Sequence, residues 1–193
     1  MKRSHVNIPI FIPHLGCPNQ CVFCNQRHIS GTYEFSTERV RELIEESLST
    51  CPEDAECEIA FFGGSFTGID RALMINLLSI AKEYKDCGKV SSIRCSTRPD
   101  YISEEILDIL IEYGVKTVEL GLQSSNDETL RRINRGHDSK CYLDAVKKLQ
   151  DKGLKVSTHV IFGLPGETRE DYINTVRCVN KSGSDAIKIH NLH

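Results

Sequence analysis

Three cysteines near the N-terminus have the residue type and spacing of a metal site. Cys17, Cys21 and Cys24 form the pattern C-x3-C-x2-C. Thiolates are soft ligands that favour iron–sulfur clusters or zinc. Three thiolates would leave one iron of a four-iron cluster without a protein ligand, and an open iron is a place for a reaction. A structural zinc site needs a fourth ligand, which His14 or His28 offers.

The other cysteines show no such pattern. The chain has 9 cysteines in 193 residues, an odd number that cannot all pair within one molecule. A small disulfide-stabilised secreted scaffold would concentrate its cysteines in a short, loop-rich chain. We therefore expect a reducing, cytoplasmic compartment. The cysteines for which we expect no chemical role are Cys51, Cys57, Cys87, Cys95, Cys141 and Cys178.

The overall composition is that of an ordinary globular domain. Hydrophobic residues make up 39%, and 24 basic against 27 acidic residues give a formal net charge of −3. This excludes a disordered chain and gives no sign of an extended nucleic-acid-binding surface. No apolar run approaches the roughly 18 residues of a membrane span, and the first residues lack the apolar stretch of a signal peptide. We expect one domain over residues 1–193 and no membrane partner.

Short apolar segments alternate with amphipathic helical segments along the whole chain. Most of the apolar segments are near-continuous, as in parallel strands that helices cover. Helices are expected after the N-caps Ser36 or Thr37, Ser103, Ser125 (with Glu128 as its capping-box partner), Asp138 and Thr168, and from about Ile69 to Tyr84. The expected strands are Asn7–Pro13, Cys57–Phe62, Ser92–Thr97, Thr117–Leu122, Lys155–Phe162 and Ala186–Asn191. This order predicts a parallel sheet, either doubly wound or part of a (β/α) barrel.

The chemically interesting residues follow the ends of the predicted strands. The first strand leads into the cysteine motif, and the next four lead into GGSFTG, STRPD, GLQSSN and GLPGET. In both candidate architectures, ligands bind at the carboxyl ends of the strands. We therefore expect these loops to meet at one edge of the sheet. The sequence stops soon after the sixth strand, so we also expect that a C-terminal, substrate-specific segment is lacking.

The cysteine segment, His14–Asn25, resembles the signature of the radical S-adenosylmethionine (radical SAM) superfamily, with Phe23 as the aromatic residue before the last cysteine. Essentially the whole chain is similar to the subgroup of the Elongator subunit 3 catalytic domain and the oxygen-independent coproporphyrinogen oxidases. The motifs that carry this similarity are FFGGSFTG, STRPDYI, GLQSSND, NRGHD and VIFGLPGET. The resemblance implies a partial (β/α)6 barrel of parallel strands with outer helices.

The resemblance also implies two cofactors and a reaction. Cys17, Cys21 and Cys24 would hold a [4Fe–4S] cluster, and SAM would bind its open iron. An electron from a reductant such as flavodoxin or ferredoxin would cleave SAM to methionine and a 5′-deoxyadenosyl radical, which would abstract hydrogen from a substrate. The related enzymes point to tRNA or to a small molecule such as a tetrapyrrole as that substrate.

Several residues match positions that bind SAM in the family. Gly63, Gly64 and Ser65 match the motif for its amino group, where glycines let the backbone approach a ligand closely. Gln123 matches a polar contact, and Arg135 matches the basic residue that faces the carboxylate, a task that suits the planar guanidinium. A flat apolar slot for adenine would lie between Phe23 and the segment that contains Ile161.

The chain departs from the family pattern at two strand positions. Ser96 stands where several relatives carry a glutamate that engages SAM, and His159 stands where the coproporphyrinogen-type enzymes carry an aspartate. Arg98 follows the Elongator-like pattern and is expected to be structural, while Arg131 and Arg132 read as solvated helix charges.

A zinc-stabilised binding module is the alternative function. Its ligands would be Cys17, Cys21, Cys24 and a histidine. The six βα units argue against it, because a small zinc module would not need so large a scaffold. Uptake of iron or of zinc by the purified protein distinguishes the two functions.

Overall fold

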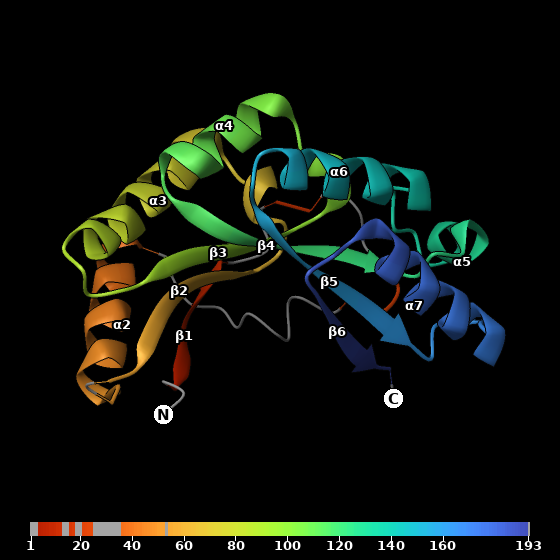
Figure 1. Cartoon of the computed structure of the whole chain (residues 1–193), viewed down its shortest axis with the longest axis horizontal. Helices are drawn as coiled ribbons and strands as arrows, with labels where there is room; N and C mark the ends of the chain where they lie inside the picture. The colour runs from red at the N-terminus through yellow and green to blue at the C-terminus, as the bar shows by residue number, and fades with distance from the viewer. Residues whose placement is uncertain (1–3, 13–15, 18–20, 25–35, 53, 193) are drawn as a thin grey trace.

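The computed structural model describes residues 4–12, 16–17, 21–24, 36–52 and 54–192. Six parallel strands form one sheet whose spatial order follows the sequence from β1 to β6. The sheet curls into the half-barrel of Figure 1, and it is not doubly wound, because each strand pairs with the next strand in the sequence. The strands are β1 His5–Ile12, β2 Glu56–Gly63, β3 Ser92–Thr97, β4 Val115–Gln123, β5 Lys155–Phe162 and β6 Ala186–Asn191.

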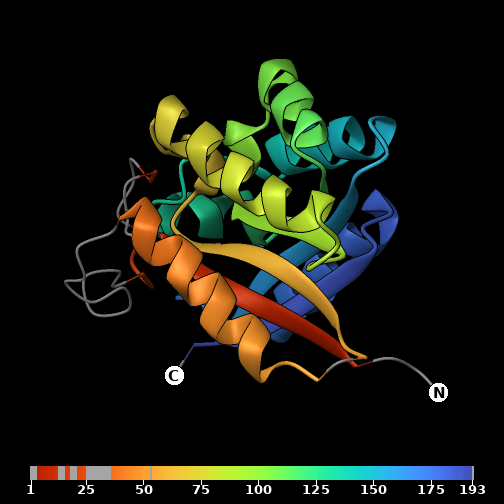
Figure 2. The same cartoon turned by 90° about the vertical axis from the view of Figure 1, so that its left-hand side faces the viewer.

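The helices lie along the convex side of the curled sheet (Figure 1). Figure 2 shows α2 beside β1, at the first edge of the sheet. Short 3-10 turns, Phe66–Gly68 and Pro99–Tyr101, follow β2 and β3. The α-helices are α2 Thr37–Thr50, α3 Arg71–Asp86, α4 Glu104–Glu112, α5 Asp127–Arg132, α6 Ser139–Asp151 and α7 Arg169–Ser182. None of the helices in the described ranges is long and apolar enough to cross a membrane.

Side-chain caps start four of the six α-helices at the expected places. The predicted N-caps Ser36, Ser103, Asp138 and Thr168 are confirmed. Helix α3 starts two residues later than expected, at Arg71, after the N-cap Asp70, whose carboxylate accepts from the backbone N–H of the third helical residue.

The predicted cap of α5 was wrong. Asn126, not Ser125, is the N-cap, and its side-chain oxygen accepts from the backbone N–H groups of Glu128 and Thr129 at 3.0 and 3.4 Å. Ser125 is occupied elsewhere, since its backbone N–H donates to the hydroxyl of Thr175 on α7 at 3.0 Å. The local pattern S-x-x-E cannot reveal a partner that lies fifty residues away.

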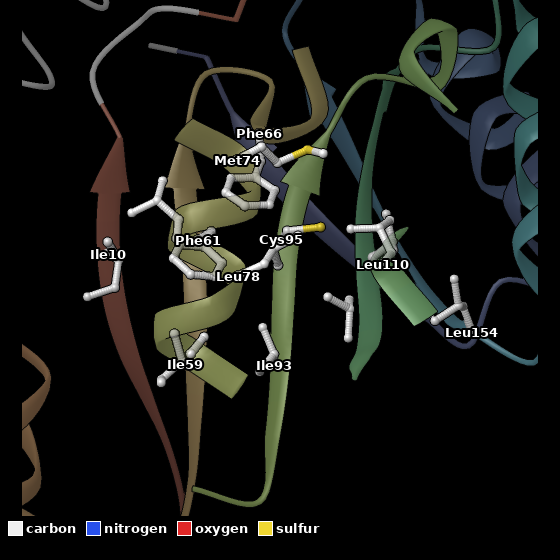
Figure 3. Packing of buried hydrophobic residues seen from close by; sticks show 14 of the residues in the cluster. Ile10, Ile59, Phe61, Phe66, Met74, Leu78, Ile93, Cys95, Leu110 and Leu154 are labelled. Carbon is white, nitrogen blue, oxygen red and sulfur yellow. The ribbon is translucent and has the colours of Figure 1, made fainter. Parts of the chain in front are cut away.

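The core lies between the sheet and the helices. Figure 3 shows Ile59 and Phe61 of β2 and Ile93 of β3 packed beneath Met74 and Leu78 of α3. All five side chains are buried. Burial of this apolar surface supplies the main stabilising contribution and fixes the strand ends relative to one another.

The concave face of the sheet is polar. Near-continuous burial, expected for most of the strands, is found in β2, whereas buried and half-buried residues alternate in β3. The reason is that the helices cover only the convex face, so every second residue of β3 points to the interior of the half-barrel. The inward residues include Arg94 and Ser96, and the neighbouring strands add Glu58 and Glu119.

Candidate functional site

The three predicted metal ligands meet the other strand ends at one cavity. Cys17, Cys21 and Cys24 follow β1 and line a cavity of about 130 Å³ together with residues in or just after β2, β3, β4 and β5. The predicted SAM-binding residues that also line it are Phe23, Gly64, Gln123 and Arg135. The expectation that these loops meet at the carboxyl edge of the sheet is therefore confirmed for the loops after β1 to β4, whereas β5 contributes His159 from within the strand instead of its following loop. The other predicted site residues, Gly63, Ser65 and Ile161, lie just outside the lining.

Gly63 and Ser65 shape the wall behind the cavity. Gly63 pairs with Ile12 in the β1–β2 ladder at a φ of 121°, and a Cβ on it would lie 2.2 Å from the Ile12 carbonyl oxygen. The Ser65 hydroxyl is buried, 2.7 Å from the Thr97 hydroxyl. It also accepts from the backbone N–H of Arg98 at 3.3 Å. The Ser65 side chain therefore joins β2 to β3 instead of facing the cavity.

The two residues expected to flank adenine share one apolar cluster. Phe23 and Ile161 both pack, partly buried, against Leu130, Ile133 and Leu164. Phe23 also lines the cavity. The arrangement provides an apolar surface next to the cysteines, as a purine would require.

The cysteine segment rests on the turn after β2 through two glycines. A Cβ on Gly16 would lie 2.1 Å from the carbonyl oxygen of Ser65, and a Cβ on Gly68 would lie 2.4 Å from that of Gly16. Only glycine permits so close an approach of two backbones. This contact was not predicted from the sequence. Its signals were the glycine directly before Cys17 and the last glycine of GGSFTG.

The environment of Cys17 combines burial with nearby positive charge. Burial raises the pKa of the Cys17 thiol, and a backbone hydrogen bond from Ser65 and the charges of Arg98 and Arg135 oppose that rise. A thiol must lose its proton to bind iron or zinc. The two buried guanidinium groups therefore favour the form of Cys17 that binds metal.

Arg135 is held against the backbone of β4 and against a cysteine. Its Nη2 donates to the Gly121 carbonyl at 2.6 Å, and its Nη1 lies 3.8 Å from the Cys21 sulfur. A Cβ on Gly121 would lie 2.6 Å from Nη2 and 2.8 Å from Nε2 of Gln123, so this glycine makes room for both side chains. Gln123 has a φ of 74°, at an irregularity of the β4–β5 pairing. Such a conformation is uncommon for a residue with a side chain and turns Gln123 at the end of the strand.

His137 is a further residue of the site that the sequence analysis did not single out. Its Nε2 accepts a hydrogen bond from Nε of Arg135 at 3.0 Å. Burial, and then the charge of Arg135, lower the pKa of His137 to about 4, so the ring is neutral at neutral pH. The signal in the sequence was the NRGHD motif, which contains both residues.

A buried carboxylate forms the inner wall of the cavity. Glu119 accepts from Ser96 at 3.1 Å and from Arg94 at 2.9 Å, and Nε2 of His159 lies 2.7 Å from its Oε2. Burial raises the pKa of Glu119, but the hydrogen bond and charge of His159, the charge of Lys188 and a hydrogen bond from Arg94 outweigh it and bring the pKa to about 2. Ser96 on β3, predicted to stand at the position of a glutamate in several relatives, thus has a carboxylate of the neighbouring strand β4 beside it.

Two buried polar atoms in the lining of the cavity could form hydrogen bonds with a bound cofactor. Arg98, predicted to be structural, donates from Nε and Nη2 to the two carboxylate oxygens of Asp100 at 2.9 and 2.7 Å. Its Nη1 and the Oε1 of Gln123 are buried and have no hydrogen-bond partner among the described residues. Both side chains line the cavity. Since buried polar groups normally have partners, a donor and an acceptor are available here for a bound group.

A four-iron cluster and a single zinc ion require different arrangements of their ligands. In the part of the chain that the structure describes, no three His, Cys, Asp or Glu side chains are placed to hold one metal ion. Ligands of a four-iron cluster bind separate irons, whereas those of zinc converge on one point. The histidines that the zinc alternative requires, His14 and His28, lie outside the described residues.

Similar proteins of known sequence cover nearly the whole chain. YtqA of Bacillus subtilis, an uncharacterized protein, is 41% identical over 194 residues, which cover 92% of this chain and 58% of that protein. YhcC of Escherichia coli is 32% identical over 189 residues, which cover 92% of this chain and 60% of that protein. The chain thus spans about 60% of the length of these relatives.

Solved structures share the fold. Elp3 of the archaeon Methanocaldococcus infernus superposes with a TM-score of 0.74 at 22% identity, over 99% of this chain and 46% of that one. Coproporphyrinogen III oxidase (HemN) of Escherichia coli superposes with a TM-score of 0.69 at 19% identity, over 100% of this chain and 45% of that one. Both confirm the predicted partial barrel. The model of the radical SAM superfamily matches residues 11–179, and the chain therefore belongs to the radical SAM superfamily.

Proposed function

We propose that the chain forms the catalytic core of a radical SAM enzyme, in which Cys17, Cys21 and Cys24 hold a [4Fe–4S] cluster and SAM binds beside them. The observation that carries this proposal is the shared cavity. The three cysteines and the buried guanidinium of Arg135 line one space at the carboxyl edge of a parallel half-barrel. Family membership implies the same two cofactors.

The chemistry that this pair supplies when bound is reductive cleavage of SAM to methionine and a 5′-deoxyadenosyl radical, which abstracts hydrogen from the substrate. The protein contributes binding, orientation and exclusion of side reactions. We assign the SAM carboxylate to Arg135, because its guanidinium is a positive charge held in a fixed position in the lining of the cavity.

The remaining SAM contacts are assigned by the groups that each residue has available. The Ser65 hydroxyl is engaged with Thr97, so we assign the SAM amino group to the backbone of residues 63–65. The Oε1 of Gln123, without a partner in the described ranges, is an acceptor for a hydroxyl or N–H of SAM. Phe23 and Ile161 offer apolar surface to the adenine.

Reconstitution with iron and sulfide under anaerobic conditions tests the cluster. We expect about four irons per chain. Cys17→Ala, Cys21→Ala and Cys24→Ala should each abolish the cluster, because each removes one of only three ligands. Cys51→Ala, which changes a cysteine at the end of α2, is the matched control and should retain it. Stoichiometric zinc without iron uptake, or loss of the cluster in Cys51→Ala, would contradict the assignment.

Formation of 5′-deoxyadenosine tests the reaction. The reconstituted protein, SAM and dithionite should produce it, and flavodoxin or ferredoxin should replace dithionite as the electron donor. The substrate classes that the sequence resemblance implies are tRNA and small molecules. Substrate-dependent stimulation of 5′-deoxyadenosine formation by one of them would identify the class.

A further inference from the structure

One buried arginine beside the cysteines has a donor group that its ion pair does not use. Arg98 directly follows β3, and its side chain is 2% exposed. It lines the same cavity as Cys17, Cys21 and Cys24. Moving a guanidinium out of water is costly unless its charge and its donors are compensated.

Asp100 compensates Arg98 only in part. Its carboxylate accepts from Nε and Nη2 of Arg98, and its own side chain is 28% exposed. The remaining group, Nη1, is buried and has no hydrogen-bond partner among the described residues. A purely structural ion pair would leave this donor both desolvated and unused, which is rare in folded proteins. The geometry therefore calls for an acceptor in the cavity.

The backbone of Arg98 is fixed to the segment that carries the first cysteine. Its N–H donates to the hydroxyl of Ser65, and the backbone of Ser65 makes a hydrogen bond with Cys17. The hydroxyl of Thr97, the residue before Arg98, lies 2.7 Å from that of Ser65. Arg98 and Cys17 are thus both hydrogen-bonded to Ser65. The charges of Cys17 and Cys21 both interact with the guanidinium of Arg98.

We propose that Arg98 tunes the cluster: its Nη1 donates a hydrogen bond to sulfur at the cluster, and its fixed charge stabilises the reduced form. This inference rests on the proposed function. Three thiolates make the site anionic, and one electron from a low-potential reductant such as dithionite adds a negative charge without a proton. Hydrogen bonds to sulfur and nearby positive charge set the potential of such clusters. Arg98 therefore raises the reduction potential of the cluster.

Arg135 differs from Arg98 in this respect. Its Nε, Nη1 and Nη2 already contact His137, Cys21 and the Gly121 carbonyl. In our assignment Arg135 places its charge beside the SAM carboxylate, and Arg98 donates a hydrogen bond to the cluster. This assignment predicts that changing Arg98 alters the cluster even when SAM is absent.

A potentiometric titration followed by electron paramagnetic resonance of the reduced cluster, without SAM, tests the inference. Wild type, Arg98→Gln and Arg98→Lys are compared after anaerobic reconstitution. At the wild-type midpoint potential, we expect the ratio of reduced to oxidised cluster to fall about tenfold in Arg98→Gln, which corresponds to about 59 mV for one electron. Arg98→Lys keeps the charge but not the fork of donors, so a smaller fall in the same direction is expected. If Arg98→Gln does not fold, the potential of Arg98→Lys alone tests the inference.

Arg41→Gln, which removes an exposed arginine on α2, is the control and should leave the potential unchanged. An unchanged potential in a fully loaded Arg98 variant would overturn the inference. So would a weakened SAM affinity at unchanged potential, since Nη1 would then serve the SAM carboxylate. Failure of the wild type to bind iron would instead refute the proposed function itself, and the two failures are therefore distinguishable.

Discussion

The Nε–H group of Arg135 donates to Nε2 of His137 across 3.0 Å. A guanidinium is always a donor, so Nε2 must present its lone pair and the ring proton lies on Nδ1. The Nδ1–H group donates a hydrogen bond to the backbone carbonyl oxygen of Asp138 across 3.2 Å. The Gly121 carbonyl, 3.3 Å from Nε2, accepts from Nη2 of Arg135 instead. A neutral histidine in one tautomer thus orients the guanidinium that faces Cys21.

His137→Ala should weaken SAM binding about tenfold, as loss of such supporting hydrogen bonds does at other cofactor sites. The reason is that Nε of Arg135 loses the acceptor that orients it. Calorimetric titration of SAM into the reconstituted protein measures the effect. His137→Gln, whose amide oxygen can accept the same hydrogen bond, should restore most of the affinity.

Lys140→Ala is the control for His137→Ala, because Lys140 is an exposed residue of the neighbouring helix α6. It should bind SAM as the wild type does. An unchanged SAM affinity in a folded, fully loaded His137→Ala would show that Arg135 does not depend on His137.

The stability of the fold should fall as the pH drops from about 6.5 to about 4. The pKa of His137 is about 4 in the folded protein because of burial and the charge of Arg135, against an ordinary 6.5. Between these values the unfolded chain binds a proton that the folded protein excludes, so the free energy of unfolding decreases with falling pH. The loss attributable to His137 is on the order of 3 kcal/mol.

Urea unfolding at pH 7 and pH 4.5 checks this pH dependence. His137→Gln has no group that titrates there, so it should lose less stability than the wild type between the two pH values. Equal losses in both proteins would show that His137 is not the titrating group.

The positions of the strands and the meeting of the cysteines with the other loops follow from local patterns. The observed bounds of β3, β5 and β6 are those predicted, because turn residues delimit apolar runs on both sides. Once the strands are parallel, their carboxyl ends share an edge, and this rule places Cys17 near Gly64 and Gln123. Arg135 lies beyond α5, and only the family resemblance predicted its place in the site. The spatial order of the strands was not decided by these patterns, since a doubly wound sheet satisfies the same alternation.

The polar interior and the supporting contacts could not be predicted, because they depend on partners distant in the sequence. Glu119 meets His159 only through the β4–β5 register, and Gly16 meets Gly68 only through the packing of two loops. Ser125 was misassigned for the same reason, since its partner Thr175 belongs to another helix. A single sequence contains each of these residues but not their pairing.

Gly68→Ala should reduce both stability and cluster content. A Cβ at this position would lie 2.4 Å from the carbonyl oxygen of Gly16, directly before Cys17, so the cysteine segment must move. We expect a loss of about 2 kcal/mol, typical of overpacking, and less than half the wild-type iron after reconstitution. Gly88→Ala is the matched control.

Gly88 has a φ of 79°, and a Cβ on it would meet nothing within 4 Å. Its replacement therefore brings only backbone strain, about 1 kcal/mol, and full iron content is expected. Equal iron contents in the two alanine variants would show that the contact between Gly16 and Gly68 does not place the cysteines.

Glu119→Gln should destabilise the fold by about 3 kcal/mol at pH 7, as removal of one partner from a buried ion pair does. The amide keeps the shape of the side chain but removes the carboxylate that Lys188 and one terminal nitrogen of Arg94 share, and Arg94 retains only its pair with Glu58. Because the pKa of Glu119 is lowered to about 2, the carboxylate stabilises the fold fully above its ordinary pKa of 4.5. This stabilisation disappears as the pH falls from about 4.5 to about 2.

The difference in unfolding free energy between wild type and Glu119→Gln should therefore be constant from pH 7 to pH 5 and shrink below pH 4.5. Denaturant titrations at pH 7, 5 and 3 measure it. Glu128→Gln, which changes an exposed carboxylate paired with Arg132 on α5, should differ little from wild type at every pH. A Glu119→Gln variant as stable as wild type at pH 7 would mean that Arg94 and Lys188 do not need this carboxylate. The charged side chains of Arg94, Glu119 and Lys188 on the concave face would then not hold one another in fixed positions beside the cavity.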